Sequence, residues 1–140
     1  MKVMMILALL LVQSVHEDTS TVYIYRNKKL IWGSAIEPPV YVDGVEVARM
    51  DNGRYFAVRL KRGTHTIQSS NYQQTTVKLD LELGETYFVR IDLVSDVGWG
   101  PGRGRPTLVQ PQLARTEVHK LRYLGADKIR DAQAERILIQ

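Results

Sequence analysis

A phrase of the form apolar-x-Leu-x-x-Gly occurs twice between residues 54 and 94, and a new alternating run follows it each time. The phrase reads VRLKRG at residues 58–63 and LDLELG at residues 79–84. Alternation of apolar and polar residues is typical of a strand with one buried face, and glycine marks turns at which strands reverse. The repeat therefore predicts an antiparallel, all-β domain.

The alternation also predicts which side chains face inward. The expected inward residues of the later strands are Phe56, Val58 and Leu60, then His65 and Ile67, then Val77, Leu79, Leu81 and Leu83, and finally Tyr87, Val89, Ile91 and Leu93. Four tyrosines fall on outward or ambiguous strand positions: Tyr23, Tyr25, Tyr41 and Tyr55. They form either an exposed aromatic patch or a layer beneath a second sheet, and the second arrangement is favoured.

The clearest turn is Asp43-Gly44, which follows residues 40–42 and supplies the two positive-φ positions of a type I′ hairpin. Val42 and Val45 then become a cross-strand pair. A short strand at residues 30–36, ended by Gly33, and a last strand at residues 107–113 are weaker expectations. Residues 95–106 are rich in glycine and proline, which predicts no regular element there.

The predicted fold is a single antiparallel β-sandwich of about seven strands, spanning residues 20–122, with a short C-terminal helical segment. Helical character lies in residues 114–121. Residues 123–140 are charged and contain few turn residues, so we expect a C-terminal tail that is helical or mobile.

The composition is that of an ordinary globular domain. The chain has 140 residues, 24% charged and 44% hydrophobic, with a formal net charge of +4. Its basic residues are scattered rather than clustered, so we expect no nucleic-acid partner. Cysteine is absent, so no disulfide stabilises the fold and no thiol is present to carry a lipid anchor.

The first residues predict export. Lys2 precedes an unbroken apolar run at residues 3–12, which as a helix would span roughly 15 Å of a hydrocarbon core about 30 Å thick. That length is typical of a signal peptide rather than a membrane span, and a cut after Ser14 fits the small-residue rule. Residues 1–14 are therefore interpreted as a signal peptide, cleaved or retained as an anchor, against the alternative of a buried N-terminal element.

No residue pattern predicts catalysis, a cofactor or a metal ion. His16, His65 and His119 are far apart, and none belongs to a metal-binding spacing. His65 shares a strand face with Ile67, which favours a hydrogen-bonded histidine at the core or its rim. The acidic residues near position 82 are explained by a solvated strand face. The chain is therefore expected not to be an enzyme, with a hydrolase kept as a remote alternative.

Residues 99–106, WGPGRGRP, form the segment with the most functional character. Arg103 and Arg105 are separated by one glycine and could direct two guanidinium groups at phosphate, sulfate or carboxylate. Trp99 could stack on a sugar or a base. Trp99, Arg103 and Arg105 are accordingly the candidate ligand-binding residues, and a flexible β-connection is the competing interpretation.

An ordered series of turn motifs supports a family resemblance. The series is SA…PPVYVDG at residues 34–44, GRYF at 53–56, LxxGTHTI at 60–67 and GxTYFVR at 84–90. It resembles a bacterial envelope family of uncharacterised lipoproteins, classed as a domain of unknown function, and is more distantly similar to PEGA-type surface domains. The resemblance covers residues 20–122 and implies a small exported β-sandwich with no established activity. Many such relatives carry a lipobox cysteine, and this chain has none.

The sequence thus predicts a non-enzymatic, exported envelope β-domain that serves as an interaction or structural module in the periplasm or at the cell surface. The expected partner is an envelope protein or glycan, and no membrane span is expected after signal cleavage. The alternative function is weak binding of a polyanion or carbohydrate through the Trp99–Arg105 loop.

Overall fold

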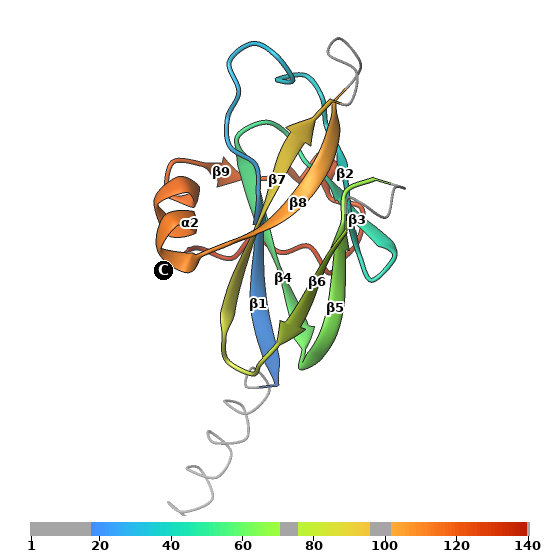
Figure 1. Cartoon of the computed structure of the whole chain (residues 1–140), viewed down its shortest axis with the longest axis vertical. Coiled ribbons are helices and arrows are strands. Elements are labelled where there is room, and N and C mark those ends of the chain that lie inside the picture. Colours follow the sequence, from blue (N-terminus) through green and yellow to red (C-terminus); the bar gives the residue numbers. More distant parts are fainter. Residues whose placement is uncertain (1–17, 71–75, 96–101, 140) are drawn as a thin grey trace, which may run out of the picture.

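A computed structural model describes residues 18–70, 76–95 and 102–139 of the chain as a β-sandwich with one short helix (Figure 1). Its elements in chain order are β1 (Thr19–Tyr25), β2 (Pro39–Val42), β3 (Val45–Arg49), β4 (Arg54–Lys61), β5 (Gly63–Gln68), β6 (Thr76–Leu81), β7 (Thr86–Val94), β8 (Arg103–Val109), α2 (Pro111–Val118), β9 (Arg122–Tyr123) and the 3₁₀ helix η3 (Ala126–Lys128). The predicted all-β sandwich with a short helix is confirmed.

The strands form two sheets. The first has the order β8-β7-β1-β4-β9 and the second the order β3-β2-β5-β6. Most neighbours are antiparallel, as the turn pattern predicts, but β1 pairs with β7 in parallel, with Tyr23 opposite Phe88. The two-residue β9 also pairs in parallel, with β4. Alternation assigns faces but not partners, so the sequence did not indicate these parallel pairs.

The main core lies between the two sheets. Its fully buried members include Ile24, Phe56 and Val89 from the first sheet and Val42 and Ile67 from the second. The predicted inward face of β4 is confirmed, as are the buried positions Leu79 and Leu81 of β6. Leu83 is an exception, because β6 ends at Leu81 and the side chain of Leu83 is 47% exposed in the following turn.

The outer face of the first sheet is also buried. Tyr23, Tyr25, Tyr55 and Phe88 form a second apolar cluster with α2 residues Ala114 and Val118 and with Ile139. These tyrosines lie beneath a helix and the C-terminal segment, not beneath a second sheet as expected. Figure 1 shows α2 against this face. The molecule therefore has three layers: the second sheet, the first sheet, and α2 with the chain end.

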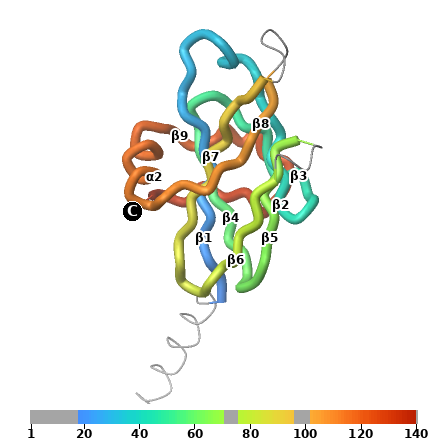
Figure 2. Tube along the Cα trace, in the orientation of Figure 1, coloured from blue at the N-terminus to red at the C-terminus, as the bar shows by residue number. Residues whose placement is uncertain are grey.

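The C-terminal segment connects both sheets. Ile129 bridges to Ala48 of β3, and Glu135 then bridges to Ala57 of β4 through hydrogen bonds of 2.8 and 2.7 Å. Figure 2 shows this red segment passing from the β9 side towards β3. Within residues 123–139 the expected helix is limited to η3; residues 131–133 form a turn, which the Ala134 N–H closes by donating to the Asp131 carbonyl at 3.1 Å.

Three local expectations are settled by the backbone. The Asp43-Gly44 hairpin is confirmed, with φ of 50° and 82° and with Val42 paired to Val45. The expected strand at residues 30–36 is wrong, because that segment forms turns. The last strand begins and ends earlier than expected, since β8 covers Arg103–Val109 and Pro111 starts α2, where its fixed φ suits the first helical position.

The prediction that residues 95–106 contain no regular element is therefore wrong for residues 103–106. Gly104 packs so closely against the second sheet that a Cβ there would lie 1.9 Å from Ser69 Oγ. Pro106 is tolerated because β8 is an edge strand. The glycine and proline of this segment thus serve packing at a sheet edge.

Candidate functional site

The loop between β1 and β2, residues 26–38, is held in place by hydrogen bonds from a buried arginine. Arg26 is 2% exposed and lies one residue beyond β1. Its guanidinium donates hydrogen bonds to the carbonyl oxygens of Gly33, Ile36 and Met50, the last at 3.2 Å. Burial lowers the pKa of Arg26, although the nearby carboxylates of Asp51 and Glu37 counteract this. The arginine therefore holds the middle of the 26–38 loop, at Gly33, and its C-terminal part, at Ile36, to the sandwich.

Two further contacts fix the course of this loop. The side-chain amide of Asn52 donates to the Lys29 carbonyl at 2.7 Å and accepts from the Lys29 amide at 2.8 Å. Gly33 has a φ of 79°, and a Cβ there would lie 2.6 Å from Leu93 Cδ1. Only glycine satisfies both conditions without strain, so the chain turns back onto β7 at this residue.

The fixed loop presents three consecutive apolar side chains to solvent, which we call the apolar tip: Leu30, Ile31 and Trp32. They are 84%, 89% and 49% exposed. Elsewhere in the described part of the chain, exposed large apolar residues occur singly. Trp32 rests on Gly102, whose added Cβ would lie 3.1 Å from the indole ring. A cluster of this kind on a preorganised loop is typical of a contact surface.

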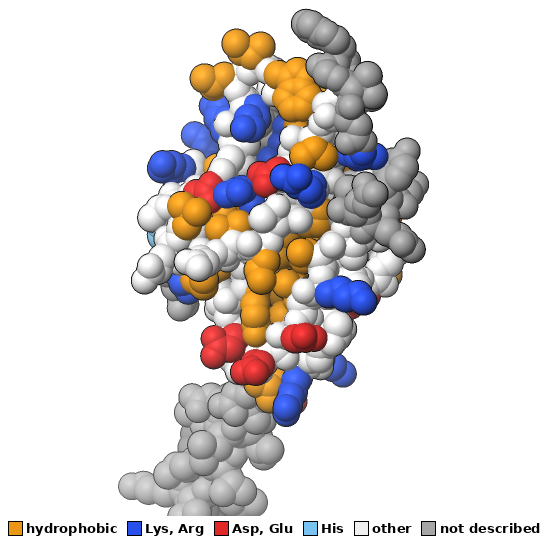
Figure 3. Space-filling model, in the orientation of Figure 1, with side chains coloured by type: hydrophobic (Ala, Val, Ile, Leu, Met, Phe, Trp, Pro, Cys, Tyr) orange, Lys and Arg blue, Asp and Glu red, His pale blue; other side chains and the backbone are white. Residues whose placement is uncertain are grey.

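Charge is distributed unevenly around the apolar tip. Lys28 and Lys29 precede it and are both exposed. At the opposite end of the sandwich, the exposed residues of the β6–β7 turn include Glu82 and Glu85. In Figure 3, hydrophobic side chains lie near the top of the described surface with Lys and Arg side chains below them, whereas the lower end carries both acidic and basic side chains.

A cavity of about 350 Å³ lies beside the 26–38 loop, where β8 meets the second sheet. Arg103, Tyr41 and Glu37 line it together with Ser69, whose hydroxyl donates to the Pro39 carbonyl at 2.8 Å. The cavity thus brings a guanidinium and a phenol beside a carboxylate, and the Glu37 carboxylate is paired with Lys128 Nζ at 2.7 Å. It places one of the three predicted ligand-binding residues in a hollow.

The other two predicted residues do not line this cavity. Arg105 is exposed on β8, and alternation along the strand places it on the same outward face as Arg103. Trp99 lies outside the described residues. The structure therefore brings Arg103 and Arg105 to one face of an edge strand.

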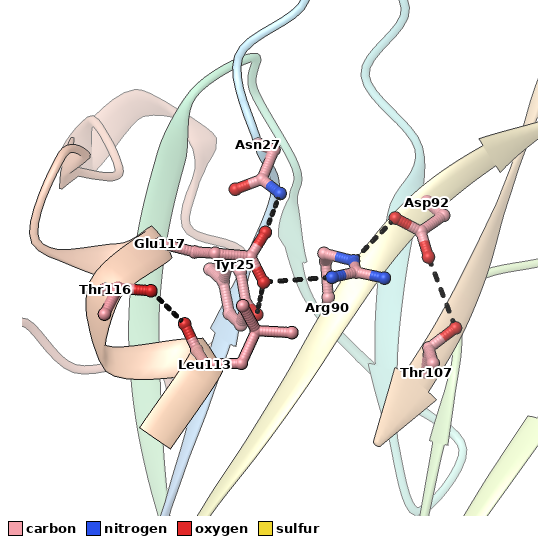
Figure 4. A network of polar contacts seen from close by, with 8 residues as sticks. All are labelled: Tyr25, Asn27, Arg90, Asp92, Thr107, Leu113, Thr116 and Glu117. Carbon is pink, nitrogen blue, oxygen red and sulfur yellow. Dashed lines mark hydrogen bonds and ion pairs between the residues drawn. The ribbon is translucent and has the colours of Figure 1, made fainter. Parts of the chain in front are cut away.

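A polar network attaches α2 to the outer face of the first sheet (Figure 4). The Glu117 carboxylate accepts hydrogen bonds from Tyr25 Oη at 3.0 Å, Arg90 Nη1 at 2.9 Å and the Asn27 amide. Burial raises the pKa of Glu117, but these donors outweigh burial and the net pKa is lowered. Arg90 also contacts Asp92 at 2.9 Å. The partners satisfy each other, so we interpret this network as structural.

His65 is a hydrogen-bonded histidine at the rim of the sandwich, as its position beside Ile67 predicted. Its Nδ1 lies 2.6 Å from Asp43 Oδ2 and its Nε2 lies 2.8 Å from the Lys61 carbonyl oxygen. Within the described ranges, no three His, Asp or Glu side chains are grouped so as to hold a metal ion. No helix in the same ranges combines the length and apolar character that a membrane span needs.

Two elements of this site were not found from the sequence. Arg26 continues the inward face of Val22 and Ile24 by one further step of two, which was an available signal for its burial. The apolar tip belongs to a short apolar run that contains Ile31 and Trp32, both strand formers, and this composition predicts a strand. Its polar neighbours Lys28 and Lys29 were the signal for a loop.

The chain belongs to the family described as Protein of unknown function (DUF2846), whose profile matches residues 16–101. The match includes β1 to β7 and the 26–38 loop, and it ends before β8. Residues 102–139 thus supply β8, α2, β9 and the C-terminal segment beyond the matched region. No curated protein and no solved structure matches the chain.

Proposed function

We propose that this chain is a non-enzymatic, exported envelope domain that binds another surface of the envelope through its apolar tip. The observation that carries the proposal is the exposure of Leu30, Ile31 and Trp32 on a loop held by Arg26. Exposing three adjacent apolar side chains costs solubility, and a fixed loop loses little entropy on binding. Export is supported by the apolar run at residues 3–12 and by the resemblance to envelope lipoproteins and PEGA-type domains.

A second candidate function is weak binding of a polyanion or carbohydrate. It is supported by the cavity lined by Arg103 and Tyr41 and by the exposed guanidinium of Arg105 on the same strand. Arginine is suited to phosphate, sulfate and carboxylate because its planar fork donates two parallel hydrogen bonds. Trp99 belongs to this proposal by its sequence position alone.

Sedimentation with isolated cell envelopes tests the first proposal. We expect the wild-type chain to sediment with envelopes and the double variant Leu30→Ser/Ile31→Ser to remain in the supernatant. The matched control is Leu83→Ser, which also removes an exposed apolar side chain but at the opposite end of the sandwich. Equal sedimentation of the tip variant and the wild type would overturn the proposal.

Retention on heparin-type and sulfated-glycan resins tests the second candidate. The double variant Arg103→Ala/Arg105→Ala should elute at clearly lower salt than the wild type. Lys61→Ala/Arg62→Ala removes two exposed cations from the β4–β5 turn and serves as the control. Equal losses in both variants would show diffuse surface charge and contradict a site on β8.

A further inference from the structure

Resting on the proposed function, we infer that the surface bound by the apolar tip is an anionic lipid bilayer. The tip and its two preceding residues read Lys28-Lys29-Leu30-Ile31-Trp32, and all five side chains are exposed. Aliphatic side chains at a loop apex enter the acyl boundary, tryptophan is favoured at the headgroup level, and lysines extend to the phosphates. The five residues thus contain the three components of an interfacial anchor in consecutive order.

The shape of the tip favours a bilayer over a protein partner. A stable protein interface buries about 800 Å² on each partner and gathers 20–30 residues a side. The apolar tip is three side chains wide, and the residues leading into it are lysines, not further apolar positions. A fluid bilayer closes around such a narrow projection, whereas a folded partner would need a matching cavity.

The two lysines next to the apolar tip would attract it to an anionic surface. Lys28 and Lys29 are consecutive exposed cations at the tip, whereas at the opposite end the exposed carboxylates Glu82 and Glu85 are accompanied by the exposed cations Lys61 and Arg62. Each basic residue near an anionic membrane contributes about 1 kcal/mol, or about fivefold, to partitioning, and the effect decays within a Debye length. Only the tip combines such cations with adjacent exposed apolar side chains, so the orientation with the tip towards the bilayer is favoured.

The contacts beneath the tip suit it for insertion. Asn52 holds Lys29 by two hydrogen bonds, and Arg26 holds the carbonyls of Gly33 and Ile36. The backbone groups that flank the tip are therefore bonded to protein, and the Ile31 carbonyl accepts from the Ser34 N–H at 3.4 Å, which lowers the cost of placing the tip in lipid. Trp32 is braced on Gly102 and would remain at the headgroup level while Leu30 and Ile31 enter deeper.

The test uses the fluorescence of Trp32. The chain has two tryptophans, so a Trp99→Phe background makes Trp32 the sole fluorophore. The probes are vesicles of phosphatidylcholine with or without phosphatidylglycerol, each carrying brominated acyl chains that quench only an inserted indole. This readout reports the tip itself and is independent of any binding by the apolar run at residues 3–12.

We expect a blue shift and quenching of Trp32 with phosphatidylglycerol vesicles, and little of either with phosphatidylcholine alone or at high salt. Lys28→Gln/Lys29→Gln should weaken partitioning about 10- to 30-fold. Leu30→Ser/Ile31→Ser should weaken it more than about 100-fold. The control Lys61→Gln/Arg62→Gln, at the far end of the sandwich, should stay within about threefold of wild type.

Two outcomes separate this inference from the proposed function. Absence of Trp32 quenching by anionic vesicles, while the tip variant still loses envelope sedimentation, overturns the bilayer and leaves a protein or glycan as the occupant. Quenching that is equal in the Lys28→Gln/Lys29→Gln variant and the wild type also overturns the inference, because the surface would then not be recognised by its charge. If Leu30→Ser/Ile31→Ser keeps both the quenching of Trp32 and the sedimentation with envelopes, both proposals are overturned.

Discussion

The side-chain amide of Asn52 bonds both backbone polar groups of Lys29, accepting from its N–H at 2.8 Å and donating to its C=O at 2.7 Å. One amide side chain thereby replaces the neighbouring strand that the 26–38 loop lacks. The residue it holds immediately precedes the apolar tip. The direction of the tip is therefore set by a residue 23 positions later in the chain.

Asn52→Ala should loosen the tip with little effect on the sandwich. Both hydrogen bonds are solvent-exposed, so we expect the free energy of unfolding to fall by about 0.5–1.5 kcal/mol. Amide hydrogen exchange of residues 28–33 should accelerate while that of the β4 core is unchanged. Asn52→Asp keeps the acceptor and loses the donor, so it should lie between alanine and wild type. If amide hydrogen exchange of residues 28–33 is unchanged in both variants, the two hydrogen bonds of Asn52 do not hold the tip.

Replacing Arg26 should be far more costly. In Arg26→Leu the carbonyls of Gly33, Ile36 and Met50 lose their shared donor at a site that is 2% exposed. We expect a loss of about 2–4 kcal/mol in urea denaturation, because buried acceptors left unpaired carry their full desolvation cost. Arg62→Leu, at an exposed turn, should stay within about 0.5 kcal/mol of wild type. Comparable losses in the two variants would mean that Arg26 does not anchor the loop.

Glu117 should stabilise the docking of α2 in a pH-dependent way. Its pKa is lowered in the folded state, so its contribution is present above the unfolded pKa and is lost as the pH falls through the folded pKa. Glu117→Gln should therefore lower the free energy of unfolding by about 1–3 kcal/mol at neutral pH. The variant should also lose less stability than the wild type as the pH falls. Glu85→Gln, on an exposed turn, is the control. If the loss of stability at acid pH is as large in Glu117→Gln as in the wild type, that loss arises from other carboxylates.

His65 should make the stability change with pH in the opposite direction, so that its contribution decreases as the pH rises. Burial lowers its pKa, but hydrogen bonds to Asp43 and to the Lys61 carbonyl outweigh burial, so the pKa is raised above its ordinary 6.5. The stability it contributes is complete below about pH 6.5 and is lost as the pH rises through the folded pKa. His65→Gln should flatten this decline in denaturation curves, whereas His119→Gln, at an exposed position, should not. A slope that persists in His65→Gln would exclude His65 as its source.

The strands with clean alternation were predictable, and their partners were not. Leu79 and Leu81 face the core because period-two patterning reports burial on one face. The same pattern left Tyr23 and Tyr25 ambiguous, because the layer that covers them comes from α2, some 90 residues later. Burial on both faces of a sheet removes the polar half of the alternation, and pairing in parallel with β7 leaves no local turn to signal it.

The candidate site was predicted only in part. Arg103 and Arg105 share one outward face, but Gly104 is a packing position against Ser69 and not a mark of a flexible loop. The apolar tip escaped prediction because a short apolar run that contains Ile31 and Trp32 favours a strand, and its exposure depends on Arg26 and Asn52, which hold the loop. The alternation continued by Arg26 indicates that its side chain is buried, but no local pattern indicates that Arg26 and Asn52 hold this loop.

The central claim is that the apolar tip is the surface through which this domain binds. Photo-crosslinking in living cells tests it most directly, with Ile31→p-benzoylphenylalanine at the tip and Leu83→p-benzoylphenylalanine at the opposite end. Their native side chains are 89% and 47% exposed, so both positions accept the probe without disturbing the core. The account predicts a specific adduct from position 31 and none from position 83. Equal labelling from the two positions, or no adduct from position 31, would contradict it.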